Sequence, residues 1–133
     1  MAKVTGVVST FNLDNSGGTA VDISSYVTSI TANTTQGQQD VTGLDKAALE
    51  RLGLLKDVSI AIGGAWGTVL HNVLKAAPAS NATRTAAIGF SNAAATLTAE
   101  VNAQDYNLSR GADGSLTWTA TLVNANGNAP VWT

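Results

Sequence analysis

The 133-residue chain has no cysteine, a single histidine and only two prolines. The lack of cysteine excludes a disulfide framework, a thiol nucleophile and a cysteine-ligated zinc site. The one histidine, His71, has no Gly-x-Ser-x-Gly motif with which to build a nucleophilic relay. We therefore expect no catalytic residues, no metal site and no cofactor, and we predict that the chain is not an enzyme.

Charge is also scarce. Charged residues make up 12% of the chain, about half the usual share in soluble domains. Seven Lys and Arg stand against nine Asp and Glu, giving a net charge of −2, and the cations are scattered singly along the sequence. Such a distribution offers no basic patch, so tight binding to the DNA backbone is not expected. A surface this neutral indicates a chain that is largely covered by further copies of itself.

Long hydrophobic runs are missing as well. No segment approaches the ~18 consecutive apolar residues that span a bilayer, and the residues after Met1 lack the apolar stretch of a signal peptide. We expect a soluble protein that is made inside the cell and has no membrane partner. Its length is that of a single domain, residues 1–133, with a hydrophobic core of its own.

What the sequence does contain is alternation of apolar and polar residues with a period of two, which is typical of half-buried β-strands. The clearest case is 57–62, where Val58, Ile60 and Ile62 share one face. Turn residues recur every 8–12 positions, as in β-sandwiches and barrels. We predict a mainly β fold, an antiparallel β-sandwich or barrel of about seven strands with one flanking α-helix. The predicted strands are 5–13, 19–22, 27–35, 57–62, 85–90, 95–103 and 116–123.

Turns are predicted where glycine and Asx residues cluster between these strands. Asp14–Gly18 has the composition of a tight hairpin turn, and 111–114 leads into the last long strand. Residues 23–26 form either a brief turn or a single helical turn. Gly63 and Gly64 are predicted to end the strand before them.

The best helix prediction is 66–75. Trp66, Val69, Leu70 and Val73 recur at helical spacing, and we expect them to pack this helix on the sheet. Pro78 would close the segment. Residues 45–52 contain strong helix formers and predict a second, marginal helix, while 36–43 is polar and is interpreted as a loop.

A few residues invite a chemical role but have simpler explanations. His71 lies off the apolar stripe of its predicted helix, so we interpret it as a partly exposed surface residue. Glu100 and Asp105 are near in sequence, yet Glu100 alternates with apolar neighbours and is expected to point outward instead of forming a catalytic pair. Trp132, next to the chain end, either packs back on the body or anchors a neighbouring molecule.

The order of motifs resembles that of small siphophage tail tube (major tail) proteins. The front half of the resemblance is carried by 22–30, by Asp40-Val41-Thr42-Gly43 and by 52–66, and the second half by 86–90, 106–109 and 115–123. The resemblance implies a β-sandwich that joins hexameric rings, and rings that stack into a tube in the virion tail. It also implies synthesis in the host cytoplasm, contact with other virion proteins, and DNA only as passing cargo.

On this resemblance, 36–55 is the segment that reaches a neighbouring subunit or ring. Charged residues in and beside it would set the register of that contact, because complementary charges contribute more to specificity than to affinity. An ordinary solvated loop is the alternative. The predicted contact residues are Asp40, Asp45, Lys46, Glu50, Arg51 and Lys56.

Two other functions fit the same sequence. One is a capsid decoration or head–tail completion protein, which cements other subunits and builds no tube. The other is a carbohydrate-binding β-sandwich module, in which an exposed Trp66 or Trp132 would stack on a sugar ring.

Overall fold

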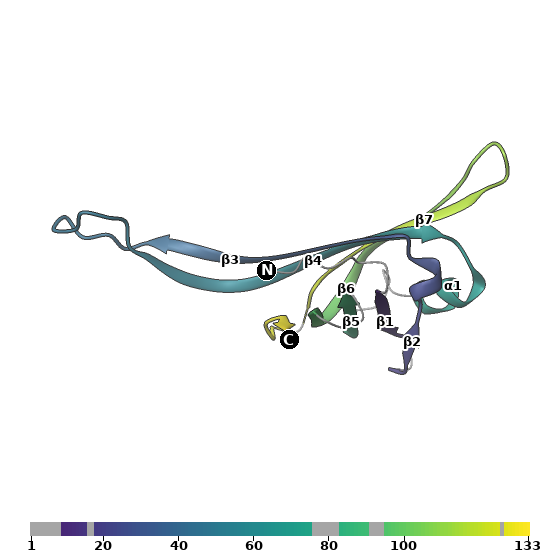
Figure 1. The fold of residues 1–133 in the computed structure, drawn as a ribbon, viewed down its shortest axis with the longest axis horizontal. Helices are drawn as coiled ribbons and strands as arrows, with labels where there is room; N and C mark the ends of the chain where they lie inside the picture. The colour runs from purple at the N-terminus through teal and green to yellow at the C-terminus, as the bar shows by residue number, and fades with distance from the viewer. Residues whose placement is uncertain (1–8, 16–17, 76–82, 91–94, 126) are drawn as a thin grey trace, which may run out of the picture.

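The computed structural model describes residues 9–15, 18–75, 83–90, 95–125 and 127–133. Its described strands form one antiparallel sheet in the order β2-β1-β5-β6-β7-β4-β3, with β8 beside β6 (Figure 1). A short helix, α1 (Thr68–Leu74), and a 3-10 turn, η1 (Ser24–Tyr26), accompany them. The strands are β1 (Thr10–Asp14), β2 (Ala20–Asp22), β3 (Ser29–Asp40), β4 (Arg51–Ala65), β5 (Arg84–Phe90), β6 (Ala95–Arg110), β7 (Leu116–Asn124) and β8 (Val131–Trp132).

β6 belongs to both halves of this sheet. Residues 95–101 pair with β5, and residues 101–110 pair with β7, with a register shift between Ala103 and Asp105. The halves β2-β1-β5-β6 and β6-β7-β4-β3 bury their apolar residues in one shared cluster. The predicted antiparallel β-sandwich with one flanking helix is therefore confirmed, as an open sheet and not as a closed barrel.

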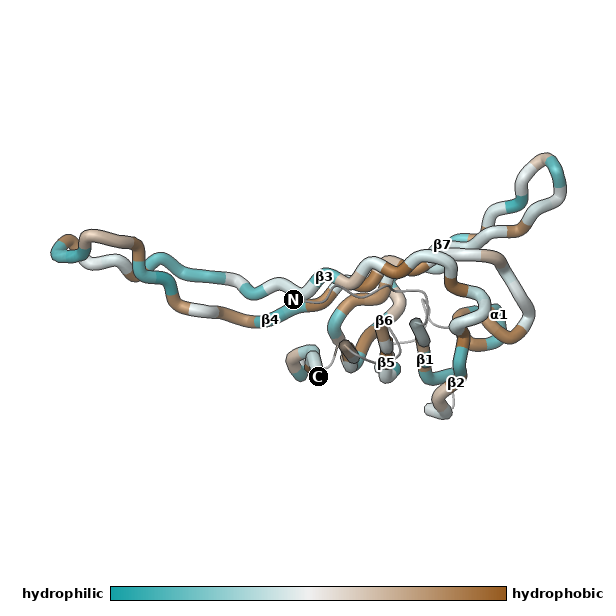
Figure 2. The backbone as a smooth tube through the Cα atoms, in the orientation of Figure 1, coloured by the Kyte–Doolittle hydropathy of each residue, from teal (hydrophilic) through white to brown (hydrophobic). Residues whose placement is uncertain are grey.

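The core follows the predicted alternation. Val58, Ile60 and Ile62 of β4 are buried, as are Trp118 and Leu122 of β7. The Trp118 indole N–H donates to the carbonyl oxygens of Tyr26 at 2.9 Å and Ala65 at 3.1 Å, so the polar atom of the largest core residue is satisfied. Figure 2 shows hydrophobic segments concentrated where the two sheet halves face each other.

The helix is shorter than predicted. It begins at Thr68, because Gly67 is extended (φ −155°), so Trp66 precedes the helix and was wrongly placed in its first turn. A side chain at Gly67 would collide with the Tyr26 ring, which packs there. Leu70 and Val73 are buried, whereas Val69 is 46% exposed and faces away from the core. Pro78 lies outside the described residues, and no helix in the described part is long and apolar enough to cross a membrane.

The largest error concerns 36–52. The predicted loop 36–43 is strand as far as Asp40, where β3 ends. The predicted helix 45–52 is absent: residues 41–50 form the turn that joins β3 to β4, and β4 starts at Arg51. Gly63 and Gly64 do not end the strand either, since β4 runs through them to Ala65. Outside the body of the molecule a short helix has nothing to pack against, while the β3–β4 ladder satisfies the backbone of both strands.

The turn predictions are confirmed where they are described. Gly18 has a φ of +82°, and the Asn15 side-chain oxygen accepts from the Thr19 backbone N–H at 3.1 Å. η1 is the predicted single helical turn at 23–26, and Gly114 takes a φ of +91° before β7. β6 is longer than predicted, because residues 105–110 also pair with β7. Residues 5–8 of the first predicted strand lie outside the described part.

Candidate functional site

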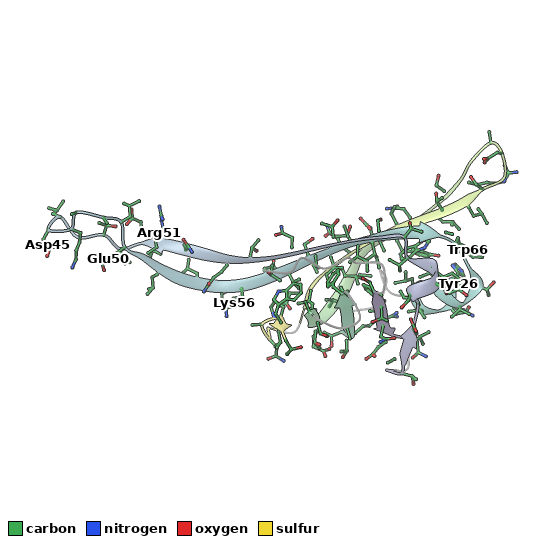
Figure 3. All side chains as sticks on the ribbon, viewed as in Figure 1. Tyr26, Asp45, Glu50, Arg51, Lys56 and Trp66 are labelled. Atoms are coloured by element: carbon green, nitrogen blue, oxygen red, sulfur yellow. The ribbon has the colours of Figure 1, made fainter. Side chains whose placement is uncertain are left out.

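Beyond the sandwich, β3 and β4 continue together as a long two-stranded hairpin, here called the arm (residues 35–57) (Figure 1). All six predicted contact residues are exposed and lie on it or at its tip. Figure 3 shows Asp45 at the tip and Glu50, Arg51 and Lys56 following one another back toward the body. The structure thus brings these residues together on one projecting element, although as a hairpin and not as a loop.

The tip of the arm is held by local hydrogen bonds. The Asp40 carboxylate accepts from the Thr42 hydroxyl at 2.5 Å and from the Thr42 backbone N–H at 2.9 Å, and these bonds lower the pKa of Asp40. The Thr42 hydroxyl oxygen accepts in turn from the Glu50 N–H at 2.7 Å. Lys46 and Glu50 form a salt bridge of 3.3 Å, with both side chains 49% exposed. Such an exposed pair is worth little, so Glu50 can exchange this partner for another at low cost.

The arm also exposes large apolar residues, and a β-bulge decides where they point. Gln36 pairs with Lys56 but Gln38 pairs with Gly53, so β4 holds one extra residue between these pairs. The bulge moves Leu52 and Leu54 to the face opposite the core; without it they would continue the buried series of β4. Exposed apolar residues of the arm and its tip are Val41, Leu44, Leu49, Leu52, Leu54 and Leu55.

The sheet half β6-β7-β4-β3 has an outer face turned away from the core. Paired residues share a face, so the register assigns its members. This face has two carboxylates, Asp57 and Asp105, and no Lys or Arg within the sandwich. Its other residues are small or neutral: Ser29, Thr31, Asn33 and Thr35 of β3; Ser59, Ala61, Gly63 and Ala65 of β4; Thr117, Thr119, Thr121 and Val123 of β7; Asn107 and Ser109 of β6.

The same half-sheet has two unpaired edges in the described part of the chain. β3 pairs only with β4, and residues 102–110 of β6 pair only with β7. β3 offers a long edge of twelve residues. Long exposed edges template pairing with another chain, and proteins normally block them with charge, proline or a covering element. Between Ser29 and Gln39, β3 contains no charged residue and no proline.

Trp66, Trp118 and His71 lie in the body, away from the arm. The Trp66 indole N–H donates to the Tyr106 hydroxyl at 3.0 Å, and His71 Nδ1 lies 3.1 Å from the same hydroxyl. His71 is partly exposed, as predicted, but its contacts with Trp66 and Tyr106 were not predicted. Glu100 and Asp105, which were not expected to form a catalytic pair, bind separate partners: Glu100 accepts from the Thr85 hydroxyl at 2.5 Å, and Asp105 accepts from the Thr121 N–H at 2.9 Å.

Trp132 packs back on the body. Its ring stacks on Phe90 with centroids 6.2 Å apart, and β8 pairs with residues 97–98 of β6, although the side chain stays 46% exposed. It also lines a groove of about 250 Å³ with Lys56 at the base of the arm. No cluster of three or more potential metal ligands occurs among the described residues.

Comparison with known proteins shows a shared fold. No protein-family model and no curated protein sequence matches the chain at a significant level. A chain in the tail of an empty GTA particle, refined with C6 symmetry, superposes with a TM-score of 0.77 at 14% identity, covering 93% of this chain and 94% of that one. A chain in the virion of a native gene transfer agent (GTA) particle gives 0.74 at 12% identity, covering 92% and 95%.

The SPP1 tail tube provides a third comparison. It superposes with a TM-score of 0.63 at 13% identity, covering 96% of this chain and 81% of that one. At such low identities the agreement is one of fold. The chain has the fold found in these tail and tail tube structures over nearly its whole length.

Proposed function

We propose that this chain is the structural subunit of a phage-type tail tube, in which hexameric rings stack into a conduit for DNA. The observation that supports this most directly is the half-sheet β6-β7-β4-β3 with its two unpaired edges. The fold of the GTA and SPP1 tail structures supports the same assembly.

The edge strands fit a ring because of their direction. The half-sheet has four antiparallel strands, so β3 and β6 run in opposite directions. A rotation about a ring axis preserves the direction of each strand along that axis. The β6 edge of one copy therefore meets the β3 edge of the next in antiparallel orientation, and the alternation continues without interruption around the ring. Closure removes both exposed edges.

Six copies would close a barrel of the right size. The C6 symmetry of the matched GTA tail suggests six copies of the four-stranded half-sheet. At ~4.8 Å between strands and a tilt of ~40°, about 24 strands give a backbone diameter of roughly 50 Å. A DNA duplex passes through such a barrel with room left for side chains.

The chemistry of the outer face suits a lumen. The sandwich core, α1 and β5 lie on the other side of the half-sheet, so the outer face is the one that turns inward when the barrel closes. Every cation facing the DNA would add a salt-dependent attraction that slows its passage. This face has no Lys or Arg within the sandwich, and Asp57 and Asp105 repel phosphate.

The arm supplies the contact between rings in this proposal. It extends along the strand direction, which at a tilt of ~40° still has its larger component along the tube axis, past the end of its own body (Figure 1). Asp40, Asp45, Lys46, Glu50, Arg51 and Lys56 are then the charged residues that set the register between rings. An exchange of the charges of Glu50 and Arg51 is expected to impair tube formation and leave the subunit folded.

Electron microscopy of the purified chain tests the proposal. Hollow filaments or hexameric rings are expected; a monomer that binds glycans, or small oligomers that bind only preformed shells, would contradict it. Disulfide trapping then tests the seam, since the chain has no cysteine of its own. Single-cysteine chains with Thr31→Cys, Asn33→Cys or Thr35→Cys on β3 are each mixed with Asn107→Cys on β6 and oxidised. One β3 position should crosslink, whereas the control Thr119→Cys, in the central strand β7, should not.

A further inference from the structure

The hairpin that joins β6 to β7 projects from the end of the molecule opposite to the arm (Figure 1). It has a small apolar patch of its own: Leu108 is 47% exposed and Leu116 is 39% exposed. Leu108 pairs with the buried Trp118, so both leucines lie on the core-side face of the sheet, beyond the end of the core. Both leucines therefore keep a substantial part of their surface accessible in the described part of the chain.

The apolar residues of the arm lie on the opposite face. Leu52 pairs with Gln39, and a Cβ at Gly37 would lie 3.3 Å from the Leu54 Cβ, which places both leucines on the side of Thr35, the outer face. The two hairpins therefore present apolar residues on opposite faces of one continuous sheet. Such faces are complementary between two copies related by translation along the strands, and they cannot meet within a single copy.

We propose, on the basis of the tube assembly above, that the arm of one copy lies over the core-side face of the β6–β7 hairpin of a copy in the next ring. Stacked rings related by translation and rotation meet head to tail, so the arm end of one ring faces the β6–β7 end of the next. The arm then lies farther from the tube axis than the β6–β7 hairpin that it contacts. Its face toward the lumen, with Leu52 and Leu54, covers Leu108 and Leu116 of that hairpin.

Charge complementarity supports this partner. Arg110 pairs with Leu116 and so shares the face of the hairpin patch, and it has no ion-pair partner among the described residues. Glu50 lies two residues before Leu52, and the bond from Val41 N–H to the Glu50 carbonyl (3.0 Å) extends the arm ladder to it. Glu50 therefore flanks the arm leucines as Arg110 flanks the hairpin leucines, and its present salt bridge to Lys46 is exposed and weak.

The buried area of this contact indicates how strong a single arm contact is. The arm is about 35 Å long and about 10 Å wide, so one face offers roughly 350 Å² to a partner. Both partners together would bury about 700 Å², below the ~1,200–2,000 Å² of a stable interface. A single arm is therefore too weak to join two free subunits, and the contact becomes effective when a whole ring presents its arms at once.

Disulfide crosslinking between single-cysteine chains tests the contact between the arm and the β6–β7 hairpin. Leu54→Cys and Leu108→Cys chains are assembled together and oxidised, and a disulfide-linked dimer is expected in the tubes. The matched control pairs Leu54→Cys with Val69→Cys, which is 46% exposed on α1 at the same end of the molecule and should not crosslink. Tubes that crosslink only through Val69, or through neither position, would overturn the inference and leave the proposed function standing. Failure of the unmodified chain to form rings or tubes would remove both.

Charge reversal gives a second, independent readout. Glu50→Arg and Arg110→Glu should each shorten tubes or stop growth at single rings, while the double reversal should restore tube length to near that of the unmodified chain. Single reversals that assemble normally, or a double variant that is no better than either single one, would count against the Glu50–Arg110 contact.

Discussion

The indole N–H of Trp66 donates to the hydroxyl of Tyr106 at 3.0 Å, which ties the chain leaving β4 to the middle of β6. An indole N–H can only donate, so the Tyr106 oxygen accepts from it. The same hydroxyl lies 3.1 Å from His71 Nδ1, where it donates or accepts according to the histidine tautomer. The hydroxyl thus couples three elements of the body: the β4–α1 connection, α1 and β6.

Replacement of Tyr106 by Phe removes the shared hydroxyl and leaves the Trp66 donor without its acceptor. We expect a loss of about 1–2 kcal/mol in the free energy of unfolding, measured by urea denaturation. Trp66→Phe removes the donor from the other side. In a double-mutant cycle the pair should couple by about 1 kcal/mol, and strict additivity would show that the bond contributes nothing.

Gly64→Ala should be far more damaging than Gly53→Ala, although both glycines lie in β4. A Cβ at Gly64 would collide with the backbone of the segment that precedes β3: with the Tyr26 carbonyl oxygen and, at 2.7 Å, with the Thr28 nitrogen. A Cβ at Gly53 meets only the flexible end of the Gln36 side chain. We expect a loss of about 2–3 kcal/mol or failure to fold for Gly64→Ala, and less than ~0.5 kcal/mol for Gly53→Ala. Equal effects would show that the backbone at Gly64 can move aside.

Arg84 is the one buried charged residue in the described core, at 4% exposure. Its guanidinium donates to the Val73 carbonyl near the end of α1, and burial lowers its pKa, an effect that the nearby Asp14 partly opposes. Arg84→Ala creates a cavity and should cost about 3 kcal/mol, while Arg84→Met keeps the volume and should cost about 1 kcal/mol. Thermal unfolding of both variants measures the difference; a more stable Ala variant would contradict the packing role.

Three turns in the chain depend on ionised aspartates. The carboxylates of Asp22, Asp40 and Asp113 accept from the hydroxyls and N–H groups of Ser24, Thr42 and Ser115, and these bonds lower the pKa of each below its ordinary value of 3.8. As the pH falls, these carboxylates are protonated in the unfolded chain before they are protonated in the folded chain. This stabilisation is therefore complete above about pH 5 and is lost as the pH falls through the lowered pKa values.

We expect the urea midpoint to be constant between pH 8 and pH 5 and to fall below about pH 4. Asp22→Asn removes one titrating group, so it should make the acid-induced fall smaller. A variant with an unchanged acid profile would show that Asp22 does not contribute to it.

The sequence predicts the sandwich well because burial creates its pattern. Val58, Ile60 and Ile62 alternate since one face of β4 touches the core, and Leu97, Ala99 and Val101 do so for β6. In the arm no core imposes a period, and the bulge at Leu54–Leu55 changes the phase of what alternation remains. Intrinsic preference then favours a helix at 45–52. In the structure only Arg51 and Leu52 join the ladder of β3 and β4, and residues 41–50 form the turn between the two strands.

The candidate site divides in the same way. The charged residues of the arm stand out in the sequence because charge is rare elsewhere, but their arrangement on a hairpin depends on long-range pairing. The neutral outer face and the two unpaired edges require the strand order, which no local pattern contains. One missed signal was partly legible: Asp-x-Ser or Asp-x-Thr occurs at five places and forms an Asx-type turn at 22–24, 40–42 and 113–115, whereas at 57–59 it lies within β4.

The arm has a consequence for how fast tubes begin and how they lengthen. An isolated two-stranded hairpin is marginally stable in water, and the arm has no core behind it. A free subunit therefore loses conformational entropy when its arm is fixed on a partner, and two free subunits offer too little contact to offset that loss. The end of an existing tube offers a whole ring of docking sites at once. Spontaneous initiation should be slow and growth at a finished ring fast, so that short seeds would abolish the lag before tubes appear.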